Sequence, residues 1–309
     1  MTYILLIFGL IGLVIGGNML VDGSVRLARS MGVSTLLIGL TLVGFGTSTP
    51  ELVTSLIAVI NKSEGIAVGN VVGSNIANIL LVLGAAAVIS PVHVDIKSFR
   101  RDSIFLILST IGLLVAVALG RINFIMGTLL TAGLISYVVY SYISDRKHQK
   151  KKKEQDSTET DTIPFSWLSL LKAVFGIAIT IWGAKLLVDN AIILARDWGV
   201  SEAVIGLTLV AVGTSLPELA TSVISAIRKE NDVAFGNVVG SNIYNALFIL
   251  GVTALFMPII VPVAMTRDVL IMTVATITLI GIAFWQKKFS RLIGALFLLA
   301  YTVYTISLF

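Results

Sequence analysis

The chain has 309 residues, of which 56% are hydrophobic and 13% are charged, and it carries a net charge of +5. Soluble globular proteins carry about 25% charged residues, so this composition excludes a soluble domain and predicts a multi-pass membrane protein with no nucleic-acid partner. The chain has no cysteine, which excludes disulfides and thiolate metal sites. No basic segment or obvious cleavage site accompanies the first apolar run, so we interpret it as a retained span rather than a signal peptide.

Apolar segments that are long enough to cross a bilayer recur along the whole chain. A spanning helix needs about 20 such residues, and ten segments fit this requirement: 3–25, 33–60, 65–89, 103–120, 122–143, 167–192, 200–227, 232–257, 268–286 and 291–308. A polar segment rich in lysine separates the fifth span from the sixth. We therefore predict an all-α membrane protein of ten transmembrane helices, with one five-helix repeat at 1–143, a cytoplasmic linker at 144–166 and a second five-helix repeat at 167–309.

The two halves of the chain resemble each other in sequence. A shift of 167 positions aligns Leu36–Ile60 with Ala203–Ile227 at 16 identities in 25, and Ile66–Gly84 with Val233–Gly251 at 13 identities in 19. Each half has an odd number of spans, so the second half must enter the membrane from the opposite side. The sequence thus predicts two inverted five-helix repeats, an arrangement typical of secondary transporters, whose sites lie near the membrane midplane at the repeat interface.

The distribution of basic residues predicts the orientation of the chain. With the central linker in the cytoplasm, the inner loops carry 16 Lys and Arg residues and the outer loops carry 4. Cytoplasmic loops are enriched in these residues. We therefore expect a multi-pass protein of the cell membrane with both termini outside.

One carboxylate lies within an otherwise apolar span of each half. Glu51 ends the segment Gly-Thr-Ser-Thr-Pro-Glu, and Glu218 ends the matching segment Gly-Thr-Ser-Leu-Pro-Glu. A charge in lipid costs several kcal/mol, so an intramembrane glutamate indicates a functional site. The only basic residue deep in a span is Lys185, near an outer end, where it can extend its ammonium group to the surface. Neither glutamate therefore has an evident structural partner.

The residues around the two glutamates are rich in oxygen atoms. Pro50 removes a backbone donor and frees a carbonyl near Gly46. The hydroxyls of Thr47 and Ser48, and those of their copies Thr214 and Ser215, add further oxygens. A second duplicated motif, Gly-Asn-Val-Val-Gly-Ser-Asn-Ile-x-Asn, contributes four more side chains: Ser74, Asn78, Ser241 and Asn245. Hard cations such as Ca²⁺ and Na⁺ prefer oxygen ligands, so the pattern predicts a cation site.

The charge of the two glutamates constrains the ions that such a site holds. Two ionised carboxylates carry a charge of −2, which one Ca²⁺ or two Na⁺ would neutralise, whereas a third Na⁺ would leave the site positive. Exchange of three Na⁺ for one Ca²⁺ would therefore move charge across the membrane.

Other polar or small residues have ordinary structural explanations. The glycines of Gly69-x-x-x-Gly73 fit helix packing, which is common in membranes. Serine and threonine hydroxyls in spans often bond back to their own helix. Asp22 precedes Arg26 by four residues, and we expect the two to pair.

These motifs resemble those of the cation/Ca²⁺ antiporter superfamily, and most closely those of the prokaryotic sodium/calcium exchangers. The resemblance rests on both duplicated motifs, covers four spans closely, and fits the layout of five plus five spans. It implies a central set of ion ligands: the side chains of Thr47, Ser48, Glu51, Ser74, Asn78, Thr214, Ser215, Glu218, Ser241 and Asn245, with backbone carbonyls near Gly44 and Ala211. It also implies that the first and sixth spans slide as a gate across a rigid core of eight helices.

One position departs from some relatives. K⁺-dependent exchangers and an archaeal exchanger branch carry aspartate where this chain has Asn245. The amide removes one potential charge and argues against K⁺ co-transport. The Gly-Asn-Ala-x-Glu signature of proton/calcium exchangers is also absent, which favours Na⁺ over H⁺ as the driving ion.

The sequence therefore predicts a sodium/calcium antiporter that works by alternating access, acts as a monomer and needs no cofactor. A calcium/proton exchanger on the same scaffold remains an alternative, because intramembrane carboxylates also carry protons. A cation channel is more remote, since we find no selectivity element. An intramembrane serine protease would need a general base, and the spans contain no histidine, so we expect no enzyme.

Overall fold

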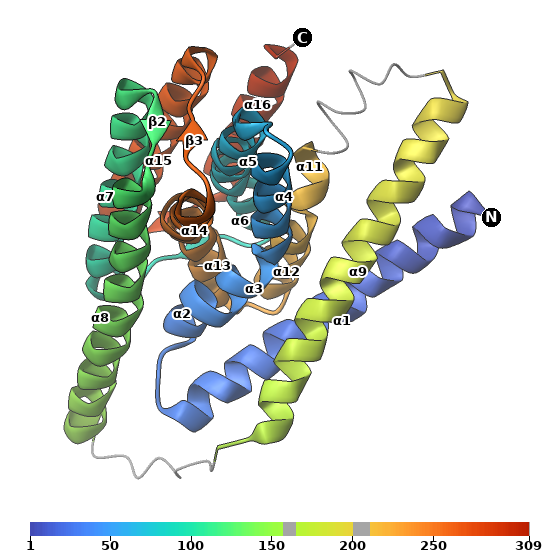
Figure 1. The fold of residues 1–309 in the computed structure, drawn as a ribbon. Helices are drawn as coiled ribbons and strands as arrows, with labels where there is room; N and C mark the ends of the chain where they lie inside the picture. Colours follow the sequence, from blue (N-terminus) through green and yellow to red (C-terminus); the bar gives the residue numbers. More distant parts are fainter. Residues whose placement is uncertain (157–164, 200–210, 309) are drawn as a thin grey trace.

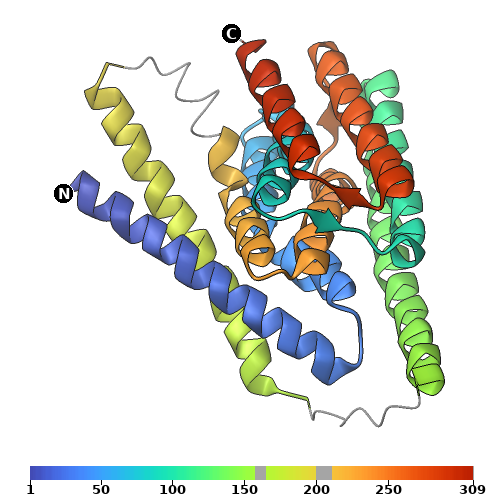
Figure 2. The same ribbon diagram turned by 180° about the vertical axis from the view of Figure 1, so that it is seen from behind.

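The structure is a computed structural model that describes residues 1–156, 165–199 and 211–308. In these ranges the chain is almost entirely helical (Figures 1 and 2). Seven helices are long and apolar enough to cross a membrane, and an eighth span results if the bent pair Thr35–Thr47 and Thr49–Ile60 counts as one. Two expected spans, the seventh and the tenth, are not in this count. Each contains a shorter apolar helix, Leu216–Ile227 in the seventh and Arg291–Ile306 in the tenth. Residues 200–210 of the expected seventh span lie outside the described residues. The prediction of an all-helical, multi-pass membrane protein is confirmed.

Two long helices form an arm beside the rest of the molecule. α1 (Thr2–Met31) and α9 (Trp167–Asp197) run antiparallel and pack along much of their length (Figure 1). A Cβ atom at Gly16 would lie 2.5 Å from the backbone nitrogen of Thr180, and one at Gly176 would lie 2.4 Å from that of Leu20. Only glycine permits so close an approach of two backbones. The arm is therefore a tightly packed unit.

Two pairs of broken helices occupy the centre of the molecule. The first pair comprises α2 (Thr35–Ile38), η1 (Gly39–Val43), α3 (Gly44–Thr47) and α4 (Thr49–Ile60), followed by α5 (Glu64–Ala77), η2 (Asn78–Val82) and α6 (Leu83–Ile89). The second comprises α11 (Ala211–Thr214) and α12 (Leu216–Ile227), followed by α13 (Asn231–Tyr244), η4 (Asn245–Ile249) and α14 (Leu250–Phe256). The η1, η2 and η4 segments are π-helical turns. Such turns are rare and often mark functional sites.

Four further helices enclose the centre on the side away from the arm. They are α7 (Ile96–Leu119), α8 (Phe124–Asp156), α15 (Thr266–Gln286), which follows the short turn η5 (Val263–Met265), and α16 (Arg291–Ile306). Short antiparallel strands join the halves: β1 (Val92–His93) pairs with β4 (Lys288–Phe289), and β2 (Arg121–Ile122) pairs with β3 (Ile259–Ile260). Each strand pair thus links one half of the chain to the other.

Helix α8 extends beyond the expected span. We predicted a span at 122–143, and the helix continues to Asp156 through residues assigned to the linker. Lysine, arginine, glutamate and glutamine are good helix formers, so the polar sequence carries the helix past the apolar part. The remainder of the expected linker, 157–164, lies outside the described residues.

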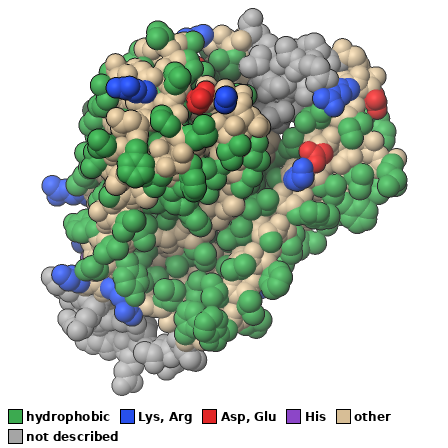
Figure 3. Space-filling view, viewed as in Figure 1, with side chains coloured by type: hydrophobic (Ala, Val, Ile, Leu, Met, Phe, Trp, Pro, Cys, Tyr) green, Lys and Arg blue, Asp and Glu red, His purple; other side chains and the backbone are tan. Residues whose placement is uncertain are grey.

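The surface has the pattern expected of a membrane protein. Apolar side chains cover the middle of the face in Figure 3, and most of the blue Lys and Arg side chains lie toward its upper and lower parts. Exposed residues such as Ile107, Leu129 and Trp182 lie within spanning helices. Water would make this exposure unfavourable, whereas lipid is as apolar as the side chains themselves.

Candidate ion-binding site

Both glutamate motifs lie where a helix is interrupted. α3 ends at Thr47 and α4 begins at Thr49, with a bend of 43° between the two segments. In the second motif, α11 ends at Thr214 and α12 begins at Leu216. Ser48 and Ser215 occupy the breaks with similar backbone angles, φ −83° and ψ 6° for Ser48 and φ −87° and ψ 2° for Ser215. Proline at the first turn of each following helix has no amide to donate, which explains why the helices break here.

The two glutamates are buried next to these breaks. Glu51 is 1% exposed and Glu218 is 0% exposed. In each carboxylate, the Oε2 atom has no hydrogen-bond partner among the described residues. A buried acceptor without a partner costs about 1–3 kcal/mol, and more when it is charged. A cation at this position would supply the missing interaction.

A hydrogen bond joins the two halves directly at the glutamates. The hydroxyl of Ser48 donates to Oε1 of Glu218 at 3.1 Å. The hydroxyl of Ser241 donates to the backbone carbonyl of Gly44 at 3.3 Å, across the same interface. These two bonds place Ser48 and Gly44 of the first half next to Glu218 and Ser241 of the second half. The carboxylates of Glu51 and Glu218 are also close enough to repel each other when both are charged.

Asn78 and Asn245 are the first residues of the π-helical turns η2 and η4. Asn78 donates its amide to Oδ1 of Asn242 at 3.2 Å, and Asn245 donates to Oδ1 of Asn75 at 3.0 Å. Within the described part of the chain, the buried Oδ1 atoms of Asn78 and Asn245 have no hydrogen-bond partner, and neither does the hydroxyl oxygen of Ser215. Asn75 and Asn242 thus fix which way the two amides face. They thereby hold the Oδ1 atoms of Asn78 and Asn245 in fixed orientations.

The sequence analysis did not identify the side chains that hold the broken helices in place. Asn237 donates to the carbonyl of Glu218 at 3.2 Å and to the hydroxyl of Ser222 at 2.9 Å. Its copy Asn70 donates to the carbonyl of Glu51 at 3.1 Å and to the hydroxyl of Ser55 at 3.1 Å. Both asparagines stand at the same position of the duplicated motif. Their identity in the two copies was the signal that could have revealed them.

The other expected ligands differ in their hydrogen bonding and in their surroundings. Thr47 is buried, and its hydroxyl bonds to the Val43 carbonyl at 3.0 Å and to Oδ1 of Asn237 at 3.1 Å, so it is back-bonded to its own helix. Ser74 is buried at the wall of a pocket that also contains Thr214. Ala211 begins α11, and its side chain lies outside the described residues. The structure thus places Thr47 in the site as a bonded hydroxyl rather than a free one.

The two glycine pairs of the second motif have different surroundings. A Cβ atom at Gly240 would lie 2.3 Å from the carbonyl oxygen of Leu40, and one at Gly236 would lie 2.7 Å from that of Leu36. In contrast, no described atom approaches within 4 Å of a Cβ at Gly73. The packing explanation therefore holds for the second copy, whereas the first copy lines a pocket.

Five charged side chains of the arm form ion pairs with one another. Asp22 binds Arg26 at 3.1 Å, which confirms the expected pair, and it also binds Lys172 of α9. Lys185 pairs with Asp189 at 3.0 Å on the exposed side of α9. No group of three or more His, Asp or Glu side chains in the described ranges forms a metal cluster. A cation in the centre would therefore rely on two carboxylates and neutral oxygens.

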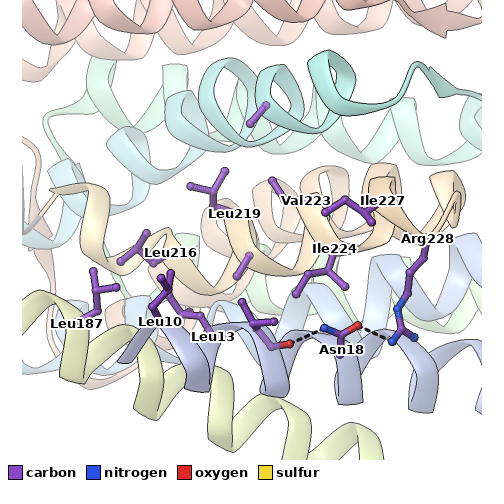
Figure 4. Close-up of a pocket in the computed structure, with 13 residues that line it drawn as sticks. Leu10, Leu13, Asn18, Leu187, Leu216, Leu219, Val223, Ile224, Ile227 and Arg228 are labelled. Atoms are coloured by element: carbon purple, nitrogen blue, oxygen red, sulfur yellow. Dashed lines mark hydrogen bonds between the residues drawn. The ribbon is translucent and has the colours of Figure 1, made fainter. Parts of the chain in front are cut away.

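An apolar groove separates the arm from the core. It has a volume of about 550 Å³ and lies mainly between α1 and α12, with leucine side chains on both walls and isoleucine side chains on the α12 wall (Figure 4). Asn18 and Arg228 form a hydrogen bond at one end of the groove. The groove itself carries no ion chemistry.

Comparisons with known proteins agree with this geometry. The family described as "Sodium/calcium exchanger protein" matches residues 1–143 and 168–309. The chain is 34% identical to the putative antiporter CaxA of Alkalimonas amylolytica, covering 98% of each chain, and 33% identical to the sodium/calcium exchanger MaX1 of Methanosarcina acetivorans, covering 100% of this chain and 98% of the relative.

The solved structures give the same result. A structure of the sodium-calcium exchanger NCX_Mj, soaked with Na⁺ and Ca²⁺, superposes with a TM-score of 0.85 at 33% identity and covers 100% of this chain and 98% of that one. The match spans both halves, including the broken helices that carry the glutamates. The chain therefore belongs to the sodium/calcium exchanger family.

Proposed function

We propose that this chain is a secondary active sodium/calcium antiporter. The observation that carries the proposal is the pair of buried carboxylates at two helix breaks, each with an oxygen atom that has no hydrogen-bond partner among the described residues. Family membership supports the same activity. No enzymatic reaction and no cofactor are needed, because Na⁺ and Ca²⁺ are themselves the substrates.

The proposed architecture is ten spans in two inverted repeats, at 1–143 and 167–309, joined by the cytoplasmic linker at 144–166. The matched breaks at Ser48 and Ser215 support the repeat relationship, as do the matched π-helical turns at Asn78 and Asn245. The two stretches that match the family coincide closely with these units. The excess of basic residues in alternate loops supports a cell-membrane protein with both termini outside and the linker inside.

The proposed ion ligands are those predicted from the sequence. They are Glu51, Glu218, Thr47, Ser48, Ser74, Asn78, Thr214, Ser215, Ser241 and Asn245, with the carbonyls of Gly44 and Ala211. Free oxygens on Glu51, Asn78, Ser215, Glu218 and Asn245 support this assignment most strongly. Hard cations take oxygen ligands, so buried oxygen atoms that have no hydrogen-bond partner among the described residues are suited to bind one.

The two ions compete for the same glutamates, and this competition couples their movements. One Ca²⁺ neutralises both carboxylates, and Na⁺ ions replace it when it leaves. With a third Na⁺, the exchange moves net charge. The tightly packed arm of α1 and α9 slides along the apolar groove beside α12, and this movement exposes the glutamates to one side at a time. All these parts lie within one chain, so we propose that a monomer suffices.

The proposal is tested by ⁴⁵Ca²⁺ uptake into proteoliposomes. Vesicles loaded with Na⁺ are compared with vesicles loaded with K⁺ and with vesicles that have an acidic interior. We expect uptake only with internal Na⁺, and faster uptake when the interior is positive. Uptake driven by internal acid and indifferent to Na⁺ would instead identify a calcium/proton exchanger, and flux that does not saturate would identify a channel.

A further inference from the structure

A pocket with both apolar and polar lining residues, on the proposed outer side, reaches the candidate ion ligands. It lies between α5, α11, α15 and α16 and has a volume of about 240 Å³. Ser74 and Thr214, two of the proposed ligands, form part of its wall. Asp268 is the only charged side chain among the described residues that line it. The pocket therefore joins a single carboxylate to the ion site.

The carboxylate of Asp268 is available to a cation. It is half-buried and accepts a hydrogen bond from the Tyr304 hydroxyl at 3.2 Å, but no described ion pair includes it. The neighbouring Arg267 instead donates to Ser307, at 3.3 Å to the carbonyl and 2.7 Å to the hydroxyl. The Tyr304 oxygen still has lone pairs after donating its hydrogen. Asp268 and Tyr304 thus present oxygen atoms to the pocket.

The first half contains the same Arg-Asp sequence with a different outcome. Arg101-Asp102 in α7 is the same dipeptide as Arg267-Asp268 in α15, which lies 166 residues later and so one residue out of register with the 167-residue repeat. Arg101 binds both oxygens of Asp102, at 2.7 and 3.0 Å, and both side chains are buried. The first-half carboxylate is therefore neutralised by its neighbour, whereas the second-half carboxylate is free.

We propose that Asp268 is an outer recruitment site for the transported cations. This inference rests on the proposed antiport function and on the proposed orientation. A Ca²⁺ or Na⁺ ion from the outer solution binds Asp268 with most of its water still attached, and it then passes to Ser74 and Thr214. A carboxylate in a pocket with low-dielectric walls raises the local cation concentration and the rate of entry. The neutralised Asp102 gives the inner side no such site.

The inference is tested in membrane vesicles of both orientations. Asp268→Asn should raise the KM for Ca²⁺ offered at the outer face by about tenfold, in line with the effect of charge on association rates. The maximal rate and the KM at the inner face should change by less than about twofold, because Asp268 is not a ligand of the central site. Asp197→Asn serves as the matched control, because Asp197 is exposed at the outer end of α9, away from the pocket.

The absence of native cysteine offers a second test. In Asp268→Cys, a negatively charged methanethiosulfonate reagent applied from outside should restore the low KM, and a positively charged reagent should raise it further. Ca²⁺ should slow the labelling. An unchanged outer KM in Asp268→Asn, an equal rise at both faces, or equal effects of the two reagents would overturn the inference. If the unmodified protein shows no Na⁺-driven Ca²⁺ flux, the antiport function itself fails.

Discussion

The hydroxyl of Ser48 donates a hydrogen bond to the Oε1 atom of Glu218, 3.1 Å away and 170 residues later in the chain. Ser48 lies at the break in the first half, and Glu218 lies in the first turn after the break in the second half. The first half therefore supplies a hydrogen bond to the buried glutamate of the second half. A change in the relative position of the halves must alter this contact.

Loss of either carboxylate should abolish exchange. Glu51→Gln and Glu218→Gln keep the size of the side chain but remove one of the two charges that we propose bind Ca²⁺. We expect no Na⁺-driven ⁴⁵Ca²⁺ uptake in proteoliposomes with either variant. Asp189→Asn is the matched control, because its carboxylate pairs with Lys185 on the exposed side of α9. Undiminished uptake in either glutamine variant would remove that residue from the ion site.

Removal of the Ser48 hydroxyl should weaken cation binding without unfolding the protein. A hydrogen bond to a charged group contributes about 1.5–3 kcal/mol, so Ser48→Ala should weaken Ca²⁺ binding by roughly tenfold or more. Equilibrium binding to the purified protein measures this effect. Thr49→Ala is the neighbouring control, because its exposed hydroxyl bonds only to the carbonyl of Phe45. Equal affinities in the two variants would show that the contact with Glu218 contributes nothing.

Asn237→Ala should destabilise the core more than Asn70→Ala. Asn237 is buried and takes part in three described hydrogen bonds, to Thr47, Glu218 and Ser222, whereas the half-buried Asn70 makes two. Each bond contributes about 0.5–1.5 kcal/mol, so the losses should be about 1.5–4.5 and 1–3 kcal/mol respectively. Thermal unfolding in detergent compares the two variants. A larger loss for Asn70→Ala would contradict the assignment of the stronger support to Asn237.

A large side chain at Gly176 should separate the two helices of the arm. Its Cβ would lie 2.4 Å from the backbone nitrogen of Leu20, so Gly176→Leu cannot be accommodated without displacing α1. We expect a lower unfolding temperature and loss of exchange. Gly281→Leu is the control, because no described atom lies within 4 Å of its Cβ. Normal exchange by Gly176→Leu would show that the arm need not remain closely packed.

The helical fold and the two glutamates could be predicted from the sequence because their signals are local. Long apolar runs and duplicated motifs mark spans and matched positions without any knowledge of tertiary contacts. The roles of Asn70 and Asn237 could not be predicted, because they depend on which carbonyl lies opposite each amide. The unequal surroundings of Gly73 and Gly240 were hidden for a related reason. The two copies of the motif have the same sequence around these glycines, but the helices packed against each copy are arranged differently.

The extension of α8 shows a different limit of the sequence analysis. Apolar composition defines where a span can lie in the membrane, but it does not define where a helix ends. Polar residues with high helix propensity continue the helix to Asp156, beyond the expected boundary at residue 143. The length of the membrane span therefore depends on apolar composition, whereas the length of the helix also depends on helix propensity.

The most direct test of the shared site is equilibrium binding of ⁴⁵Ca²⁺ to the purified protein at increasing Na⁺ concentrations. If Na⁺ and Ca²⁺ occupy the same glutamates, the apparent Kd for Ca²⁺ should rise without limit, and more steeply than in proportion to Na⁺, because several Na⁺ replace one Ca²⁺. A Kd that reaches a plateau would mean that both ions bind at once to separate sites. That result would contradict competition at Glu51 and Glu218 as the basis of coupling.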